Sequence, residues 1–219
     1  MEKYLKFLKK CSLFSGVTDA ELLKMLGCLG ARVSFFDRRE VVMEEGSEPR
    51  YIGVVLTGSV QTVQIDYFGN RSIVDFAKEG ELFMESFACA KAKELPVSAV
   101  AVEPSFVMFI DSDHIVYTCE NNCGFHQRMI FNLMRTLADK SIRFHQRIEV
   151  TSKRTTREKL ISYLSQQSKN CGGNEFDIPF DRQELADYLE VDRSGLSSEI
   201  GRLRREGFLE SRKNHFKLL

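Results

Sequence analysis

The feature that most constrains this chain is a pair of short amphipathic helices predicted over residues 181–207. Asp181 stands in the N-cap position of the first helix, and Glu184 follows in capping-box position. Asp192 can cap the second helix, whose apolar residues recur at spacings of four and three. The apolar residues of the pair are Leu185, Ala186, Leu189, Val191, Leu196, Ile200 and Leu203. Two capped helices with facing apolar sides predict a helix-turn-helix.

The opposite side of the second helix is basic and rich in hydroxyl groups. It carries Arg193, Ser194, Ser197, Ser198, Arg202 and Arg205. Guanidinium groups bind guanine edges and phosphates, and hydroxyls bond several base edges, so such a helix suits the DNA major groove. The alternative is a plain helical hairpin whose charges face solvent. The agreement of caps, apolar side and basic side favours DNA binding.

The segment after Gly207 completes the pattern of a winged helix-turn-helix, because residues 208–219 read as two short strands around a basic turn. We expect bases to be read by Arg193, Ser194, Ser197 and Ser198. We expect phosphates to be held by Gln183, Arg202, Arg205, Arg212 and Lys213.

The overall charge gives no signal for nucleic acid, because 31 Lys and Arg balance 31 Asp and Glu. The positions of the arginines are therefore more informative than the net charge. No apolar run approaches the ~18 residues of a membrane span, and the N-terminus is unlike a signal peptide. We expect a cytoplasmic protein without a membrane partner, with its six cysteines reduced. No catalytic triad, phosphate loop or paired catalytic carboxylates stand out, so we do not expect an enzyme.

The N-terminal part of the sequence is predicted to form a helix followed by many short strands. Thr18 or Asp19 can cap the helix, Gly30 ends it, and its inward residues would be Leu22, Leu23, Leu26 and Leu29. The predicted strands cover residues 32–36, 40–43, 52–56, 59–65, 72–77, 97–102 and 106–110. Short strands at fairly even spacing favour an antiparallel β-roll or jelly roll, and hence an α+β chain.

A long helix is predicted next, and it carries two apolar stripes. The first is a heptad-like seam of Ile130, Met134, Leu137, Ser141, Phe144 and Ile148. The second consists of Phe131, Ala138 and Ile142. We expect one stripe to pack on the roll and the seam to form a homodimer interface, since a two-fold dimer matches a palindromic DNA site. The alternative, in which both stripes are buried within one chain, stays open.

These patterns predict three parts: a sensor domain over 1–120, a dimerisation helix over 121–150, and the winged helix-turn-helix over 151–219. Thr151-Ser152 breaks the helical pattern and marks the last boundary. A helix over 155–167, a loop over 169–174 and an extended segment over 176–179 lead into the helix-turn-helix.

Roll, long helix and winged helix together resemble the cyclic-AMP receptor/fumarate-nitrate regulator (CRP/FNR) family of bacterial transcription factors. The resemblance is carried by Gly46, Gly58, Gly80-Glu81-Leu82-Phe83, Arg157-Glu158-Lys159-Leu160, Arg182 through Leu189, Arg193 and Leu196-Ser197. It implies a homodimer whose effector domain controls two DNA-reading helices, with promoter DNA and RNA polymerase as partners.

The effector site departs from the cyclic-nucleotide-binding members of that family. Met84 replaces a Gly and Val97 replaces the arginine that neutralises the cyclic phosphate, although Glu85 and Ser98 are kept. A buried phosphodiester without a cation is costly, so we expect an unknown small-molecule effector other than cyclic AMP. Its pocket would be formed by Arg71, Gly80, Glu81, Leu82, Phe83, Met84, Glu85, Ser86, Val97 and Ser98. A filled core with no ligand is the alternative.

The reading helix departs from the family as well. Ser194 stands where a glutamate is common and Ser198 where a second arginine is common, so DNA binding is predicted but not the DNA sequence. Glu190 replaces a Gly that is frequent at the turn.

Two further functions are weighed. Cysteines, including the pair Cys119 and Cys123, would make a redox- or metal-sensing regulator, for which Cys11, Cys28 and Cys89 are the other candidates. A cyclic-nucleotide-binding module that acts on a protein partner is the second possibility, and the basic reading helix argues against it.

Overall fold

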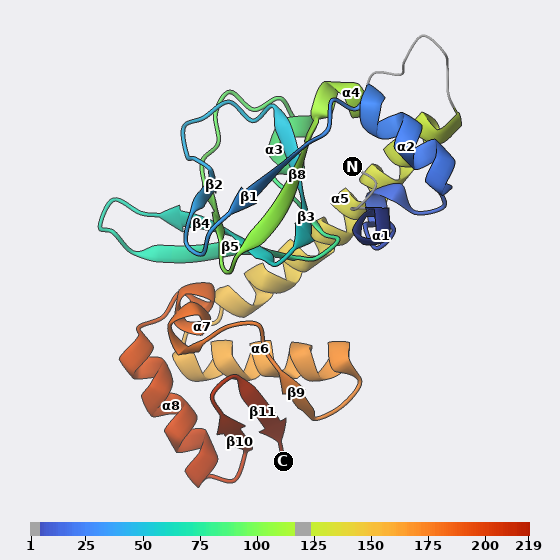
Figure 1. Ribbon diagram of the computed structural model, residues 1–219. Coiled ribbons are helices and arrows are strands. Elements are labelled where there is room, and N and C mark those ends of the chain that lie inside the picture. Colours follow the sequence, from blue (N-terminus) through green and yellow to red (C-terminus); the bar gives the residue numbers. More distant parts are fainter. Residues whose placement is uncertain (1–4, 117–123) are drawn as a thin grey trace. The chain divides into compact units, whose positions relative to one another are not determined.

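The structure is a computed structural model that describes residues 5–116 and 124–219 (Figure 1). Its contacts divide the chain into two compact units. The first contains Met1–Asn70 and Val74–Ser141, and the second contains Arg71–Ile73 and Ile142–Leu219. The sequence-based division into three parts stays a prediction, because the long helix is shared by both units.

The first unit is built on two four-stranded sheets. One has the strand order β1-β8-β3-β6, with bounds Arg32–Phe36, Ser105–Asp111, Tyr51–Thr57 and Leu82–Phe83. The other has the order β2-β7-β4-β5, with bounds Val41–Met43, Ser98–Ala101, Ser59–Ile65 and Arg71–Lys78. The antiparallel pairing of β3 with β8 and of β4 with β7 confirms the predicted roll. All seven predicted strands form, and only β6 was not predicted.

Short helices flank this roll: α1 (Leu5–Leu8), the 3-10 turn η2 (Ser12–Phe14), α2 (Asp19–Cys28), α3 (Glu85–Cys89) and α4 (Ser112–Val116). Thr18, rather than Asp19, caps α2 and forms a capping box with Glu21. Leu22, Leu26 and Leu29 are buried as predicted. The prediction for Leu23 is wrong: it is 37% exposed, because it is turned about 100° around the helix from Leu22.

Phe83 on β6 is packed over the backbone of Gly53 on β3. A Cβ atom added at Gly53 would lie 2.1 Å from the Cζ atom of Phe83, so only glycine fits beneath the ring. Gly53 pairs with Phe83 in the sheet, and the ring then joins an apolar cluster between the sheets. The cluster consists of Val55, Val60, Ala77, Phe83, Met84, Leu95, Val97, Ala99, Val107 and Phe109.

Helix α5 (Gly124–Thr151) is a single helix that passes from the first unit into the second. Its buried face carries Met129, Leu133 and Lys140, with Leu137 packed beside them. Side chains exposed elsewhere on the helix are Phe131 (57%), Met134 (58%), Ile142 (58%) and Ile148 (63%). The prediction that the second stripe packs on the roll is therefore wrong, because Phe131, Ala138 and Ile142 are exposed.

The predicted seam of α5 is divided by this packing. Met134, Ser141 and Ile148 are exposed, Ile130 and Phe144 are half-buried, and Leu137 packs on the core of the first unit. A face that includes a buried lysine replaces the purely apolar stripe that was expected to cover the roll.

The second unit contains α6 (Thr156–Cys171), β9 (Glu175–Asp177), α7 (Arg182–Leu189), α8 (Arg193–Arg205), β10 (Leu209–Arg212) and β11 (His215–Leu218). Its three strands form a sheet in the order β10-β11-β9. Helix α6 is longer than predicted and is followed by Gly172, whose φ of +68° is typical of a residue that ends a helix. The rings of Tyr163, Phe180 and Tyr188 pack together, and those of Phe180 and Tyr188 are stacked with their centroids 4.8 Å apart.

Within the described residues, every helix is too short or too polar to cross a membrane.

Gly53→Ala should destabilise the first unit, because the new methyl group collides with the Phe83 ring. Overpacking of this kind costs about 1–3 kcal/mol of the free energy of unfolding, measured by urea denaturation. Gly27→Ala in α2 is the control, because its Cβ atom meets nothing within 4 Å and alanine stabilises helices. Equal stability of Gly53→Ala and wild type would contradict the prediction.

Candidate DNA-binding face and effector site

The helix-turn-helix of the second unit is built on the predicted caps. The carboxylate of Asp181 accepts a hydrogen bond from the backbone N–H of Glu184 at 2.9 Å, and the Glu184 carboxylate accepts one from the N–H of Asp181 at 2.8 Å. Asp192 accepts from the N–H of Gly195 at 2.8 Å. Glu190 adopts φ +53° at the turn, as a residue in place of Gly must, and its carboxylate pairs with Arg147 at 3.1 Å.

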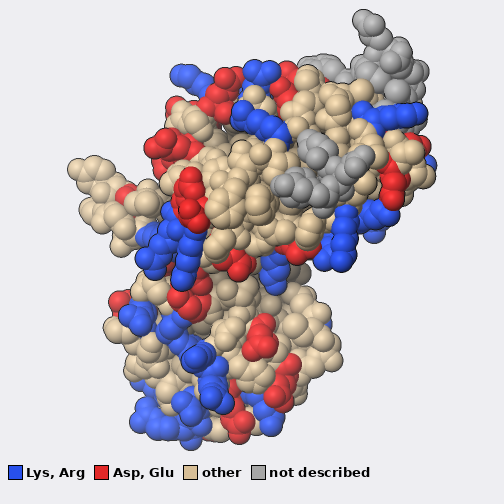
Figure 2. Space-filling view, viewed as in Figure 1, with Lys and Arg blue, Asp and Glu red and all other residues tan. Residues whose placement is uncertain are grey.

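The packing of α8 separates an apolar side from a polar one. Leu196, Ile200 and Leu203 are buried, against the buried Leu185, Ala186 and Leu189 of α7. The exposed residues of α8 are Arg193, Ser194, Gly195, Ser197, Ser198, Arg202, Arg204 and Arg205. Figure 2 shows Lys and Arg side chains gathered over the side of the second unit that contains α8. The helix therefore presents a basic, hydroxyl-bearing surface on a fixed apolar base.

The side chains predicted to contact DNA fall into two groups. Within the described part of the chain, the side chains of Arg193, Ser197, Ser198, Arg212 and Lys213 have no hydrogen-bond or ion-pair partner. The others have partners in their own unit: Gln183 donates to Asp187, Ser194 to Asp192, Arg202 to Glu199 and Arg205 to the Gly201 carbonyl. The first group is free to meet a ligand without breaking an existing contact.

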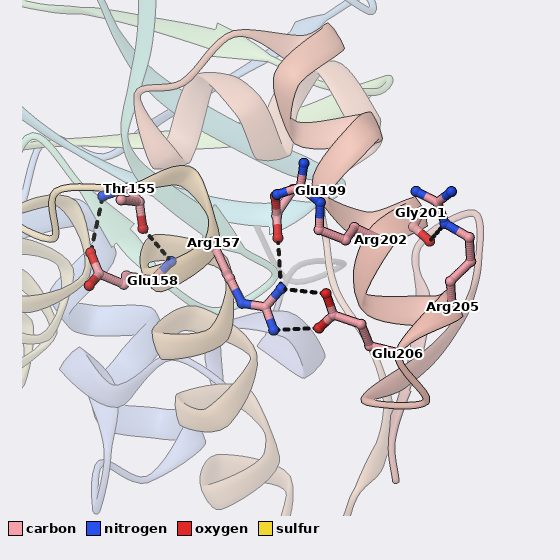
Figure 3. A network of polar contacts seen from close by, with 8 residues as sticks. All are labelled: Thr155, Arg157, Glu158, Glu199, Gly201, Arg202, Arg205 and Glu206. Carbon is pink, nitrogen blue, oxygen red and sulfur yellow. Dashed lines mark hydrogen bonds and ion pairs between the residues drawn. The ribbon is translucent and has the colours of Figure 1, made fainter.

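Arg157 of α6 joins that helix to α8, and the sequence analysis gave it no role. Its guanidinium donates to Glu199 at 3.2 Å and makes two bonds to Glu206, the nearer oxygen 2.5 Å away (Figure 3). The hydrogen bond to Glu206 raises the pKa of Arg157, and the same bond lowers the pKa of Glu206. Glu199 also accepts from Arg202 at 3.2 Å. The sequence does contain a signal for this contact. Glu199 lies at the edge of the apolar side of α8, where a carboxylate requires a cation opposite it.

The wing is held to the helix-turn-helix by Arg182. Its guanidinium donates to the Lys213 carbonyl at 3.0 Å and lies 5.5 Å from the centre of the Phe216 ring, and burial lowers its pKa. Lys213 itself lies in the turn between β10 and β11 with φ +54°. The predicted basic turn is thus present, and Arg182 fixes its backbone.

The residues predicted to form an effector pocket are only partly brought together. Phe83, Met84 and Val97 are buried in one packed apolar cluster of the first unit. Ser98 uses its hydroxyl to accept from the Glu45 N–H at 3.0 Å, and Ser86 is exposed. Arg71 belongs to the second compact unit, so the structure does not place it with the others.

The segment that leads into this cluster contains two residues with positive φ, Gly80 and Met84. Gly80 has φ +84° and precedes Glu81, whose carboxylate accepts from the Lys78 N–H at 3.0 Å. Leu82 is buried in the neighbouring core cluster. Met84 has φ +61°, a left-handed conformation that favours Gly and is strained for methionine. The substitution of Gly by Met at this position was visible in the sequence, and the structure shows that the backbone has kept the glycine conformation.

The side chain of Glu85 follows Met84 and is 1% exposed. Its carboxylate lies 2.9 Å from the ammonium nitrogen of Lys140, a residue of α5 that the sequence analysis did not single out. Lys140 also donates to Asp75 at 2.7 Å. A buried ion cluster therefore occupies the polar end of the predicted pocket.

A separate cavity of about 420 Å³ lies at the surface of the first unit. Its walls carry the ion pairs Arg50–Asp111 at 2.8 Å and Lys91–Asp113 at 3.0 Å. None of the predicted effector residues lines it.

Four cysteines of the described residues are free thiols: Cys11 is buried, Cys89 is half-buried, and Cys28 and Cys171 are exposed. Burial raises the pKa of Cys11 to about 12 and that of Cys89 to about 11, which disfavours reactive thiolates. Within residues 5–116 and 124–219, no group of three His, Cys, Asp or Glu side chains is placed to hold a metal ion. Cys119 and Cys123, the predicted Cys-x3-Cys pair, lie outside the described residues.

Two family models match the chain. Residues 33–122 match the cyclic nucleotide-binding domain, and residues 158–219 match the Crp-like helix-turn-helix domain. Regulatory protein HlyX of Actinobacillus pleuropneumoniae is 22% identical over 177 residues, which cover 78% of this chain and 71% of that protein.

Solved structures of the same architecture are numerous. The c-di-GMP responsive global regulator CLP of Xanthomonas campestris matches with a TM-score of 0.74 at 15% identity, covering 91% of this chain and 99% of that one. FixK2 of Bradyrhizobium japonicum matches with a TM-score of 0.66 at 18% identity, covering 86% and 92%. At these identities the similarity establishes the fold.

Replacing Arg157 by Gln should loosen α8, because Glu199 and Glu206 lose their shared cation. Amide hydrogen exchange of α8 should become faster, while exchange in the first unit stays unchanged. Arg154→Gln, an exposed arginine close by in sequence, is the control and should leave α8 protected. Unchanged protection of α8 in the Arg157 variant would show that the ion pairs do not fix the helix.

Proposed function

Because this chain belongs to the CRP/FNR family of transcriptional regulators, we propose that it binds promoter DNA as a homodimer under the control of its β-roll domain. Members of the family are not enzymes. The observation that carries the proposal is the surface of α8, where Arg193, Ser197 and Ser198 are exposed without partners above a buried apolar base. RNA polymerase is the expected protein partner at a promoter.

In this proposal, the N-terminal half of α8 reads bases. Arg193 begins the helix, where side chains of a reading helix reach base edges, and guanine is the base that arginine binds best. Ser197 and Ser198 present hydroxyls that can donate or accept. The long side chains of Arg212 and Lys213 on the wing turn, with Gln183, Arg202 and Arg205, would hold phosphates. Ser194 would read a base only by leaving its bond to Asp192.

The homodimer is supported by the exposed apolar side chains of α5. Phe131, Met134, Ile142 and Ile148 are each more than half exposed, and their spacing places them on one side of the helix. Exposed apolar residues gathered on one helix face are typical of an interaction surface. A second copy of the chain would cover them, with Phe131 and Ile142 added to the seam and Leu137 removed from it.

An effector other than cyclic AMP is supported by the chemistry of the roll. Val97 is buried in an apolar cluster at the position where an arginine would neutralise a cyclic phosphate, and Met84 fills the place of a glycine. An anion placed there would lose its hydration without gaining a cation.

The test of DNA binding is fluorescence anisotropy with a duplex from the region upstream of the gene, compared with random DNA. Arg193→Ala should relax sequence preference at one position and cost about 1–3 kcal/mol of binding free energy. Lys213→Ala is the matched comparison. Loss of a phosphate contact should weaken binding to all sequences and lower the slope of log affinity against log salt concentration by about one unit. Equal losses on specific and random DNA for Arg193→Ala would show that Arg193 touches only phosphate.

Met134→Glu should convert the dimer to a monomer, because a charge would be buried in the interface. Multi-angle light scattering should give twice the 25.1 kDa chain mass for wild type and the single mass for the variant. Leu23→Glu is the control, because Leu23 is an exposed apolar residue of α2 outside this face. A dimeric Met134→Glu protein would place the interface elsewhere.

A further inference from the structure

Glu85 is a charged side chain in a place where charge is expensive. It is 1% exposed, at the start of α3 and inside the region that matches a cyclic nucleotide-binding domain. Among the described residues, neither of its carboxylate oxygens accepts a hydrogen bond. A buried carboxylate is tolerated only with a compensating partner, and in a ligand-binding domain that partner can be the ligand.

Lys140 supplies the compensating charge from within the chain. Its ammonium nitrogen lies 2.7 Å from Asp75, 2.8 Å from the Leu82 carbonyl and 2.9 Å from Glu85. Two of its three protons are donated, to Asp75 and to the Leu82 carbonyl, and the contact with Glu85 is an ion pair. Burial alone lowers the pKa of Lys140, but the two carboxylates more than offset this, so the pKa is raised and the group is charged at neutral pH.

The surroundings of this ion cluster leave little for an external ligand to bind. Phe83, Met84 and Val97 lie in a packed apolar cluster, and the charge of Lys140 is already paired with the carboxylates of Asp75 and Glu85. The buried carboxylate, which would otherwise bind hydroxyl or ammonium groups of an effector, is already neutralised.

The position of Lys140 connects this cluster to the long helix. Two polar residues of α5 contact the N-terminal segment of the first unit: Asn132 donates to the Leu13 carbonyl at 3.0 Å, and Thr136 bonds Ser12 at 3.0 Å. Lys140 instead reaches β5, β6 and α3 of the roll. Ser141 is the last residue of α5 in the first unit, and Ile142 begins the second. Lys140 is therefore the contact with the roll that lies at the boundary.

We propose that Lys140 is an internal ligand of the sensor domain, which occupies the effector site and makes DNA binding independent of a small molecule. The inference rests on the proposed DNA-binding function and replaces its unknown effector by a side chain. A ligand shifts an equilibrium only through its different affinity for two states, and a tethered ligand is always present. The domain would then hold α5 in one state at all effector concentrations.

The test combines a readout that needs no DNA with one that does. Full-length protein is denatured in guanidinium chloride, refolded, and shown by native mass spectrometry to carry no small molecule. Its melting temperature and its anisotropy on the upstream duplex are then measured with and without cyclic AMP, cyclic GMP and cyclic di-GMP. The variants are Lys140→Gln, Glu85→Gln, the double variant, and Lys24→Gln, an exposed lysine of α2, as the control.

The expected result is a refolded wild type that binds DNA within twofold of the native protein and melts at the same temperature with every nucleotide. Lys140→Gln should lower the melting temperature by roughly 6 °C or more and weaken DNA binding at least tenfold, because Glu85 is left buried without a cation. The double variant should recover at least half of the lost melting temperature, since both charges are then gone. Lys24→Gln should match wild type.

Three outcomes would overturn the inference: a nucleotide that raises the melting temperature of wild type by several degrees, a Lys140→Gln protein that behaves like Lys24→Gln, or strictly additive effects of the two substitutions. Wild type that fails to bind DNA while the melting cycle shows coupling would remove the proposed function and still support Lys140 as the occupant of the site.

Discussion

The burial of one face of α5 against the first unit is the interaction on which the other features of the chain depend. Met129 and Leu133 are buried in its core, and Asn132 and Lys140 add polar contacts to backbone carbonyls and carboxylates. A helix that commits this face leaves the opposite one, with Phe131 and Met134, uncovered. The same helix continues into the second unit, which carries the reading surface. The packing of this one face of α5 therefore defines both its contact with the first unit and the surface that remains available to a second copy.

Features set by neighbours in sequence were predicted correctly. The caps at Asp181 and Asp192, the apolar side of α8 and the two strands of the wing are all confirmed. Strands β1 and β4 have the predicted bounds, because their β-branched and aromatic residues and a nearby turn glycine such as Gly58 define them locally. The helix-turn-helix candidate site could be named residue by residue for this reason, although its DNA contacts stay predictions.

Features set by contacts between distant segments were missed. A lysine within a long helix is ordinarily expected at the surface. The residues near Lys140 in the sequence do not indicate that it forms ion pairs with Asp75 and Glu85. The heptad-like spacing of α5 identified apolar residues but could not decide which face the roll would cover, because the buried face includes the charged Lys140. Arg157 and Glu206 are likewise separated by three secondary-structure elements of their unit. The effector pocket was predicted less well than the reading helix because its residues come from several such segments.

The close approach of Phe83 to Gly53 has a consequence for how this chain can change over evolutionary time. The two positions share one volume, so neither can be substituted as if the other were absent. A larger residue on β3 is admissible only in lineages where the ring on β6 has first become smaller, because in the reverse order the new side chain collides with the ring. Phe83 immediately precedes the strained Met84 and the buried Glu85. The history of this loop is therefore tied to a glycine on a different strand, and the two positions should vary together among descendants of the same ancestor.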